Sequence, residues 1–470
     1  MRAPSCFQGS TAHLDLGPRF FQPVLAANFP QHTVRYQNLR WAEQVGLGDL
    51  DEAAWVRHFG KFEALDASLP EPIALAYHGH QFRNYNPDLG DGRGFLFGQM
   101  HDPSDGRLLD FGTKGSGRTP WSRGGDGRLT LKGGVREILA TSMLEALGVD
   151  TSKTFSIIET GERLSRGDEP SPTRSAVMVR LSHGHLRIGS FQRHAYSNDL
   201  DAVEALARHA AKHYLPGLDA TAPIAELAVQ LVTRVVDATA RTAADWTAAG
   251  FVHGVLNTDN INITGESFDY GPWRFLPNMD PHFTAAYFDD AGLYAFGRQP
   301  HAVLWNVSRL AECFAELAEQ KDLSLALSGF DDAFNGALNA ALSRRLGIAP
   351  QDARRLELGL HLFPALHQAD VGFETFFFDT YGGRQAVRRD IAHISYGDTP
   401  LAQIVADLAT CEPAPHITPH HAYFQGQAPC TMLIDEVETI WSAIADRDDW
   451  SDLKTKLSAI DDMRIAYATA

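Results

Sequence analysis

The polar segment HGVLNTDNINITGESFDYG (residues 253–271) contains the residue types with the clearest potential for chemistry. Asn260 and Asp269 lie nine residues apart around the short apolar stretch INI, which we expect to be a strand of a β-hairpin. Such a hairpin would bring an amide oxygen and a carboxylate together. Hard cations such as Mg²⁺ prefer these ligands together with phosphate oxygens, so the polar segment predicts a metal site beside a bound phosphate.

The polar segment also holds a candidate proton acceptor. In kinase-like phosphotransferases a catalytic aspartate precedes the metal-binding asparagine by five positions, and Val255 occupies that position here. Valine cannot accept a proton. Asp259, immediately before Asn260, is therefore the candidate general base. The alternative is that Asp259 only caps the turn, a common role of aspartate.

A lysine and a glutamate upstream are placed to aim a positive charge at phosphates. Lys114 ends the apolar stretch LLDFGTK, a predicted strand, and Glu137 lies on the helix predicted downstream. A strand lysine paired with a helix glutamate is how kinase-like folds present an ammonium group to a nucleotide. Lys114 is one of six clustered cations: Lys114, Arg118, Arg123, Arg128, Lys132 and Arg136. For most of them, a solvated basic face is the simpler interpretation.

Two further groups are candidates for binding phosphate. Gly90, Gly92 and Arg93 lie in the turn PDLGDGRG, where glycine lets backbone amides approach an anion and arginine adds a forked cation. A plain hairpin turn is the alternative there. Arg180 closes a predicted strand and Arg187 lies in the turn after it, and a surface position is equally compatible with either residue.

The elements that must position these residues divide the chain into a sheet-rich and a helix-rich part. Short strands are predicted at residues 92–100, 108–115, 155–160 and 175–181. Apolar residues at spacings of three and four predict helices around residues 135–147, 224–235 and 303–317. We therefore expect an α+β fold with an N-terminal extension packing on the lobes (residues 1–73), a small sheet-containing lobe (74–195) and a helical large lobe (196–470).

Composition limits the partners and the compartment. The net charge of −17, from 41 Lys and Arg against 58 Asp and Glu, argues against nucleic acid or an acidic membrane as a general partner. Four widely spaced cysteines form no C-x-x-C pair, so neither a zinc site nor a disulfide scaffold is indicated. The sequence shows neither a signal peptide nor a membrane-spanning apolar run, and a cytoplasmic protein is expected.

Several motifs, taken as an ordered set, resemble those of the selenoprotein O family. They are YHGHQFRNYNPDLGDGR, KGSGRTPWSR followed by DGR and REIL, HLRIGSF, HGVLNTDN with DYG, and YAFGRQPHAVLWNVSRLAE. The resemblance implies a bilobal, protein-kinase-like pseudokinase fold with a sheet-containing small lobe and a mainly helical large lobe. It further implies flipped binding of ATP and transfer of AMP to Ser, Thr or Tyr hydroxyls of other proteins, with release of pyrophosphate.

The resemblance also implies roles for individual residues. Asp259 would be the general base, Asn260 and Asp269 would bind Mg²⁺ or Mn²⁺, and Glu137 would pair with Lys114. The residues that would hold ATP are Gly90, Gly92, Arg93, Lys114, Asp126, Gly127, Arg180, Arg187 and Asp269. We expect a monomer that modifies protein substrates and itself. A conventional hydroxyl kinase and a non-catalytic ATP-binding scaffold are the alternative functions.

Overall fold

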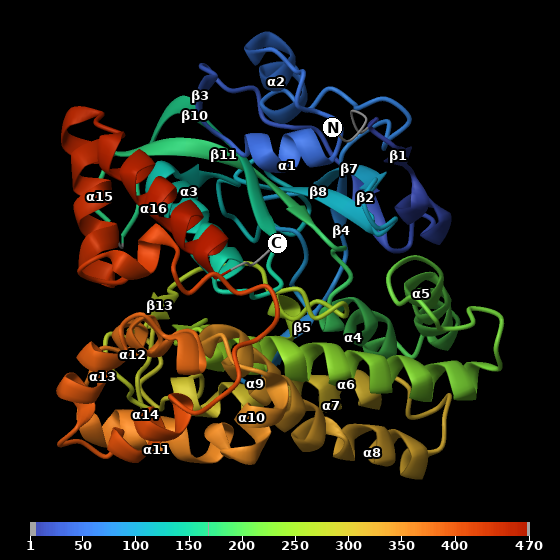
Figure 1. Cartoon of the computed structure of the whole chain (residues 1–470). Helices are drawn as coiled ribbons and strands as arrows, with labels where there is room; N and C mark the ends of the chain where they lie inside the picture. The colour runs from blue at the N-terminus through green and yellow to red at the C-terminus, as the bar shows by residue number, and fades with distance from the viewer. Residues whose placement is uncertain (1–5, 168, 468–470) are drawn as a thin grey trace.

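A computed structural model of the chain describes residues 6–167 and 169–467. An antiparallel sheet occupies the upper half of the molecule in Figure 1, and helices fill the lower half. The strand order is β2 (Phe21–Pro23), β4 (Ile73–Leu75), β7 (Leu96–His101), β8 (Leu108–Lys114), β11 (Thr173–Ser182), β10 (Lys153–Leu164) and β3 (Thr33–Gln37). At its sides, β1 (Gly9–Ser10) pairs with β7, and β9 (Leu129–Thr130) pairs with β11. This mixed architecture agrees with the α+β class predicted from the sequence.

The two faces of the sheet are covered by different helices. They are α3 (Leu131–Ala146) on one face, and α1 (Leu39–Gln44) with α2 (Glu52–Phe59) on the other. Successive residues of β11 alternate between the two cores, because side chains alternate along a strand. Ala176 and Met178 pack in the core that contains α3, whereas Val177 and Val179 pack in the core that contains α1 and α2. Helices on both faces thus hold the sheet in place, and with it Lys114, the last residue of β8.

The lower half is built around α6 (Ile224–Ala248), which runs below the sheet in Figure 1. The other helices of this half are α4 (Ile188–Tyr196), α5 (Leu200–His213), α7 (Gln299–Glu312), α8 (Gln320–Ser328), α9 (Phe330–Leu346), α10 (Pro350–Arg355), α11 (Leu358–Ala369), α12 (Phe373–Thr380), α13 (Arg389–Tyr396) and α14 (Ala402–Leu408). The predicted helix at 303–317 corresponds to α7, which ends earlier, at Glu312. Among the described helices, none combines the length and the apolar character needed to cross a membrane.

Both ends of the chain depart from the predicted division. The sequence predicts residues 1–73 as an extension packed on the lobes, whereas β1, β2 and β3 of this segment are strands of the main sheet, paired with β7, β4 and β10. The sequence also assigns all residues after 196 to a helical lobe. However, the last two helices, α15 (Ile434–Arg447) and α16 (Ser451–Ala466), pack on α3 in the upper half.

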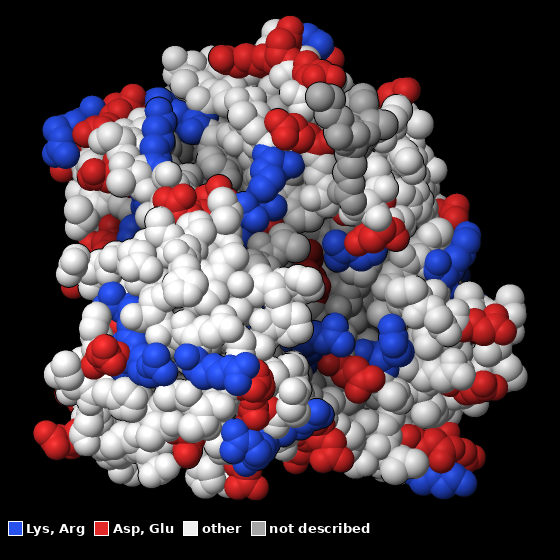
Figure 2. Space-filling view, in the orientation of Figure 1, with Lys and Arg blue, Asp and Glu red and all other residues white. Residues whose placement is uncertain are grey.

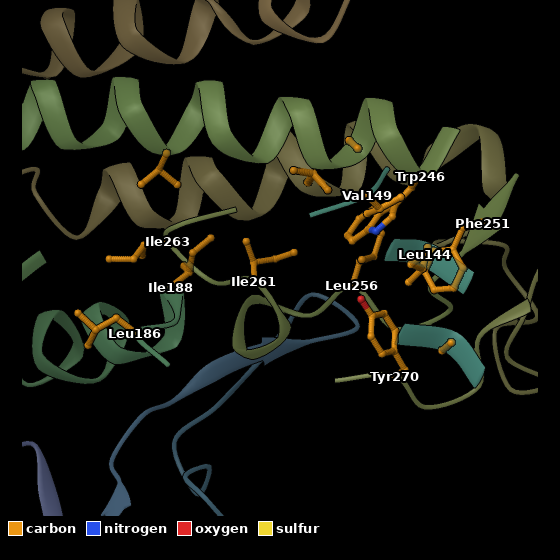
Figure 3. Packing of buried hydrophobic residues seen from close by; sticks show 14 of the residues in the cluster. Leu144, Val149, Leu186, Ile188, Trp246, Phe251, Leu256, Ile261, Ile263 and Tyr270 are labelled. Carbon is orange, nitrogen blue, oxygen red and sulfur yellow. The ribbon is translucent and has the colours of Figure 1, made fainter. Parts of the chain in front are cut away.

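The polar segment (residues 253–271) lies between the two halves and is anchored from below. Leu256, Ile261, Ile263 and Tyr270 are buried in one core with Trp246 of α6, as Figure 3 shows. The apolar residues that alternate with the polar ones therefore fix the backbone of the polar segment. The candidate site residues are carried on this fixed backbone.

The β-hairpin predicted within the polar segment is wrong, because its two arms pair with other parts of the chain. The backbone of residue 261 accepts a hydrogen bond from the amide of residue 188, and the amide of residue 263 donates to the carbonyl of residue 186. The later arm pairs with residues 150–152 through Ser267. Asn260 itself lies on the short 3₁₀ helix Thr258–Asn260.

Candidate active site

A cavity of about 640 Å³ is lined by the sheet, its loops and the polar segment. This volume is typical of a small-molecule site. Among its lining residues, seven cations outnumber four carboxylates: Arg93, Lys114, Arg123, Arg128, Arg166, Arg180 and Arg187 against Asp91, Asp126, Asp259 and Asp269. In a chain of net charge −17, this local excess of positive charge supports the binding of an anion.

Charge is otherwise mixed over the surface that faces the viewer in Figure 2. Acidic and basic side chains are interspersed there, and the face is hollowed between the upper and lower halves, with Lys and Arg side chains near the opening. The positive excess is therefore a property of the cavity lining and not of this face as a whole.

The structure brings the predicted site residues together with one exception. Gly90, Gly92, Arg93, Lys114, Asp126, Gly127, Arg180, Arg187, Asp259, Asn260 and Asp269 all line this cavity. The exception is Glu137, which lies behind Lys114 on α3 and is almost fully buried. Lys114, Asn260 and Asp269 thus face a single crevice although 155 positions separate the first from the last.

A buried ion-pair network forms the back wall of the cavity. Lys114 Nζ lies 2.8 Å from Glu137 Oε2 and 3.1 Å from Asp269 Oδ1. Arg180 Nη2 lies 3.3 Å from both carboxylates. Two cations therefore alternate with two carboxylates, so that each charge is compensated inside the protein. Lys114 and Arg180 are held on neighbouring strands, which fixes where their charges point.

Asp269 remains ionised because of this network. Burial alone would raise its pKa, but the positive charges of Lys114, Arg180, Arg187 and Arg93 outweigh burial and hold the pKa of Asp269 well below its usual range. Its backbone is in the left-handed region, with φ of +62°. Aspartate tolerates this conformation better than most residues, and the turn directs the carboxylate into the cavity.

Asp259 has the opposite environment. Its side chain is buried, and within the described part of the chain its Oδ1 has no hydrogen-bond partner. Burial raises the pKa of Asp259 to about 6, although the nearby Arg187 works against this shift. Arg187 Nη1 donates to the backbone carbonyl of Asp259 at 2.9 Å, and therefore holds the backbone without bonding to Oδ1 of the carboxylate.

Asn260 is oriented by its own loop. Its side-chain nitrogen donates to the backbone carbonyl of Val255 at 3.1 Å, which leaves the amide oxygen available to a ligand. Val255 also lines the cavity, in the position where a catalytic aspartate is expected in kinases. The loop therefore offers one amide oxygen and one free carboxylate side by side in sequence.

Two loops meet at the opposite wall and depend on glycine. A Cβ at Gly90 would come within 2.4 Å of the Trp121 ring, so the glycine allows the indole to pack directly on the backbone. Gly127 has φ of +69°, and a Cβ there would lie 2.2 Å from the carbonyl oxygen of Gly117. The turn PDLGDGRG is thus more than a hairpin turn, because it forms a wall of the cavity with the loop that carries Trp121.

Asp126 lies at the rim of the cavity. Its carboxylate pairs with Arg166 Nη1 at 2.8 Å and accepts the backbone amide of Arg128 at 2.9 Å. Although partial burial works against it, these hydrogen bonds lower the pKa of Asp126. Asp126 is therefore anionic and already partnered by protein cations, which distinguishes it from Asp259.

The solvated basic face predicted between residues 114 and 136 is wrong for three of its members. Arg128 Nε lies 2.8 Å from Glu162, and Lys132 Nζ lies 2.7 Å from Glu438. Arg136 packs its guanidinium over the Trp273 ring at 4.8 Å. Their partners come from distant parts of the chain, so local sequence could not reveal them.

The sequence interpretation missed several residues of the site. The Arg187 guanidinium lies over the rings of Tyr77 and Phe268, 4.5 and 4.9 Å from their centroids. Arg166 supports Asp126, and Trp121 forms part of the wall. Tyr77 and Trp121 stand in two of the motifs that carry the family resemblance, and Phe268 is the apolar residue next to Asp269, so each carried a signal. Arg166 lies in a loop outside these motifs and carried none.

The donor set fits a divalent metal that is shared with phosphate. Among the described residues no group of three or more His, Cys, Asp or Glu side chains could hold a metal alone. Mg²⁺, however, is usually bound by one or two carboxylates together with substrate phosphates and water. The ionised Asp269 and the free amide oxygen of Asn260 match such a set, in a cavity with cations for the phosphates.

Comparison with known proteins finds similarity over nearly the whole chain. The sequence model of the family described as "Protein adenylyltransferase SelO" matches residues 7–461. "Protein nucleotidyltransferase YdiU" of Synechocystis sp. is 41% identical over 466 residues, which cover 94% of this chain and 96% of the relative. The proteins of the same name from Trichodesmium erythraeum and Gloeobacter violaceus are 41% and 40% identical, and the alignments cover 95% and 93% of this chain and 97% and 92% of those relatives.

Proposed function

This chain belongs to the SelO family of protein adenylyltransferases, and from that premise we propose that it transfers AMP from ATP to Ser, Thr or Tyr hydroxyls of protein substrates. The observation that carries the proposal is the meeting of Lys114, Asn260 and Asp269 in one cationic cavity with the free carboxylate of Asp259. The chain itself, through an exposed hydroxyl, is a further candidate acceptor.

The fold that we propose is bilobal and protein-kinase-like. A strand lysine paired with a helix glutamate, facing a DYG aspartate, supports this assignment. Residues 74–195 would be the nucleotide-binding part of the small lobe, to which β1–β3 and the last two helices are added. The large lobe would start at residue 196. Val255 in the position of the kinase aspartate makes the chain a pseudokinase by sequence.

The cations of the cavity would bind the triphosphate of ATP. Lys114 and Arg180 are fixed by Glu137 and Asp269, so their charges are positioned before the substrate arrives. Arg187 lies over two aromatic rings, and it lines the same cavity. Fixed charges of this kind stabilise a transition state without reorganising during the reaction. Asn260 and Asp269 would hold Mg²⁺ or Mn²⁺, which supplies charge neutralisation at the phosphate oxygens when bound.

Asp259 would remove the proton from the acceptor. The hydroxyl oxygen of the protein substrate attacks the α-phosphorus of ATP, the bond from the α-phosphorus to the bridging oxygen breaks, and pyrophosphate leaves. The hydroxyl proton passes to a carboxylate oxygen of Asp259. With a pKa of about 6, this carboxylate is mostly ionised near neutral pH and yet basic enough to accept a proton. ATP in the flipped orientation presents the α-phosphate to the acceptor.

The setting in which we propose this reaction is a monomer in the cytoplasm. Across the described residues the four cysteines are free, which suits a reducing compartment. The net charge of −17 and the restriction of positive excess to one cavity favour a nucleotide over a nucleic acid as the bound anion.

ATP labelled separately at the α- and γ-phosphates tests the proposal. The full chain is incubated with Mg²⁺ or Mn²⁺ and each label, alone and with a cell extract, and the modified proteins are mapped by mass spectrometry. We expect only the α label on Ser, Thr or Tyr. Transfer of the γ label would identify a conventional kinase, and ATP binding without covalent label would identify a scaffold. Asp259→Asn should slow labelling by about 10²- to 10³-fold.

A further inference from the structure

The last two helices of the chain pack against the helix that carries Glu137. Figure 1 shows α15 and α16 lying along α3 at the left of the upper half. Val437, Ile440 and Ile460 of this C-terminal pair are buried in the same core as Val135 and Leu139 of α3. Helix α3 is thus covered by the sheet on one side and by the C-terminal pair on another. It therefore packs against a segment about 300 residues away in sequence.

A charged contact fixes the N-terminal turns of α3 to α15. Lys132 lies in the first turn of α3, where a positive charge is unfavourable because of the helix dipole. Glu438 of α15 lies 2.7 Å from Lys132 Nζ and 4.0 Å from Arg136 Nη1. A carboxylate from the C-terminal helix therefore compensates the two cations that precede Glu137.

Arg136 connects this contact to the polar segment. Its Nη2 donates to the backbone carbonyl of Gly271, the last residue of the DYG triplet, at 3.3 Å and to that of Trp273 at 3.2 Å. Arg274 lies nearby and repels it, whereas Glu438 attracts it. Displacement of Glu438 would therefore disturb the contact of α3 with the residues that follow Asp269.

The C-terminal pair is also anchored to both halves of the molecule. Asp448, at the end of α15, lies 3.2 Å from Arg35 and 2.7 Å from Arg174 of the sheet. At the other end, Tyr467 follows α16 into the helical half, where the Arg345 guanidinium lies over its ring at 4.9 Å. The C-terminal pair is thus fixed to both halves while it packs on α3 in the upper half.

We infer that α15 and α16 form a built-in brace that keeps α3 where Glu137 meets Lys114, with Glu438 as the positioning residue at the contact. Glu438 does not line the cavity, so it acts through Arg136 and α3. The inference deepens the proposed function and rests on it for the activity readout. It assigns a role to a C-terminal segment that carries none of the nucleotide-binding residues. A brace of this kind makes the Lys114–Glu137 pair a permanent feature of the folded chain.

The test compares two charge reversals on the brace. Glu438→Lys places a third positive charge beside Lys132 and Arg136, whereas Asp462→Lys makes the same change at an exposed position of α16. Hydrogen exchange of the amides of residues 131–146 is measured in the ligand-free full chain, together with kcat for AMP transfer and the melting temperature. We expect E438K to speed exchange in α3 and to lower kcat by about threefold to tenfold. D462K should change neither.

The exchange measurement separates this inference from the proposed function. If the wild-type chain transfers no AMP, the proposed function fails, and unchanged exchange of α3 in E438K would still overturn the brace. Faster exchange with an unaltered kcat would also overturn it, because α3 would then move without consequence for the reaction. Glu438→Gln removes the charge without reversing it, and it should give the same pattern with a smaller change. It keeps the test decisive if E438K does not fold.

Discussion

Among the carboxylates that line the cavity, Asp269 lies beside Lys114 and Arg180, and Asp259 lies on the loop that faces them. Their surroundings shift the pKa values of the two groups in opposite directions. Lys114 lies 3.1 Å and Arg180 3.3 Å from Asp269, and the surrounding positive charges hold its pKa well below the usual range despite burial. Asp259 is buried with one oxygen that finds no partner among the described residues, and its pKa rises to about 6. The same type of side chain, aspartate, thus has a lowered pKa at one position of the cavity and a raised pKa at another.

The difference teaches which carboxylate can take which role. A carboxylate that is ionised at every relevant pH and surrounded by cations is suited to bind a metal or to order charges, but it is a poor proton acceptor. A carboxylate with a pKa near the working pH is suited to accept a proton. Asp269 therefore suits the proposed metal site and Asp259 the proposed role of proton acceptor, and this physical difference in pKa is not visible in the sequence.

The largest expected effect comes from Asp269→Asn. The variant loses the charge that orders Lys114 and Arg180 and that would bind the metal, so kcat/KM for AMP transfer should fall on the order of 10³-fold or more. The ligand-free protein should also lose about 2 kcal/mol of unfolding free energy, less than for a fully buried pair because 27% of the Asp269 side chain is exposed. Kinetics with α-labelled ATP and urea unfolding measure the two quantities.

The matched control for this variant is Asp290→Asn, at an exposed position that does not line the cavity. It should leave both quantities near those of the wild type. An Asp269→Asn protein that kept wild-type kcat/KM would show that Lys114 and Arg180 need no carboxylate at 269 for AMP transfer. It would also remove the metal site from the proposal.

The next largest effect is expected for Asp259→Asn, and its two parts should have opposite signs. Loss of the proton acceptor should lower kcat by about 10²- to 10³-fold. The ligand-free protein should nevertheless gain about 1 to 3 kcal/mol of stability at pH 7.5, because the native state no longer holds a desolvated carboxylate whose pKa burial raises from 3.8 to about 6.

The pH dependence of that gain supplies its own control. Below its native pKa, Asp259 of the wild type takes up a proton and its desolvation cost falls, so the stability gain of Asp259→Asn should shrink as pH falls toward 4. Urea unfolding of both proteins at several pH values measures this. A destabilised Asp259→Asn protein would show that favourable contacts hold the carboxylate, although its buried Oδ1 has no hydrogen-bond partner among the described residues.

The sequence contains much of the fold because local patterns determine local structure. The strand that ends at Lys114 and the helix that carries Glu137 follow from apolar periodicity and from the glycine at 148, and both are present. The hairpin around Asn260 is absent, since its backbone groups pair with residues 186–188 and 150–152. Local sequence allows a hairpin there, but distant strands and turns compete for the same hydrogen bonds.

The residue types of the candidate site were predictable from the sequence, but their burial, their pairing and their pKa values were not. Motifs around Lys114, Asn260 and Asp269 carry their identity in sequence. Their burial and pairing depend on contacts between residues far apart, such as Lys114 with Asp269. The raised pKa of Asp259 is of this kind, because it results from the desolvation that the assembled halves impose. The contact of Glu438 with Lys132, 306 positions apart, likewise has no local signal.

The smallest expected effect is a pH dependence that reports the difference between the two carboxylates directly. The kcat/KM of the wild type should rise about tenfold per pH unit below 6 and level off above it, because only the ionised Asp259 accepts a proton. Asp269, with its lowered pKa, stays ionised throughout and should leave no inflection between pH 5 and 8. Asp245 also has a pKa near 6, but it lies on α6 and pairs with Arg344 outside the cavity lining. The residual activity of Asp259→Asn should therefore be flat across this range. An inflection near 6 that persisted in this variant would assign the titration to another group and would end the role of Asp259 as base.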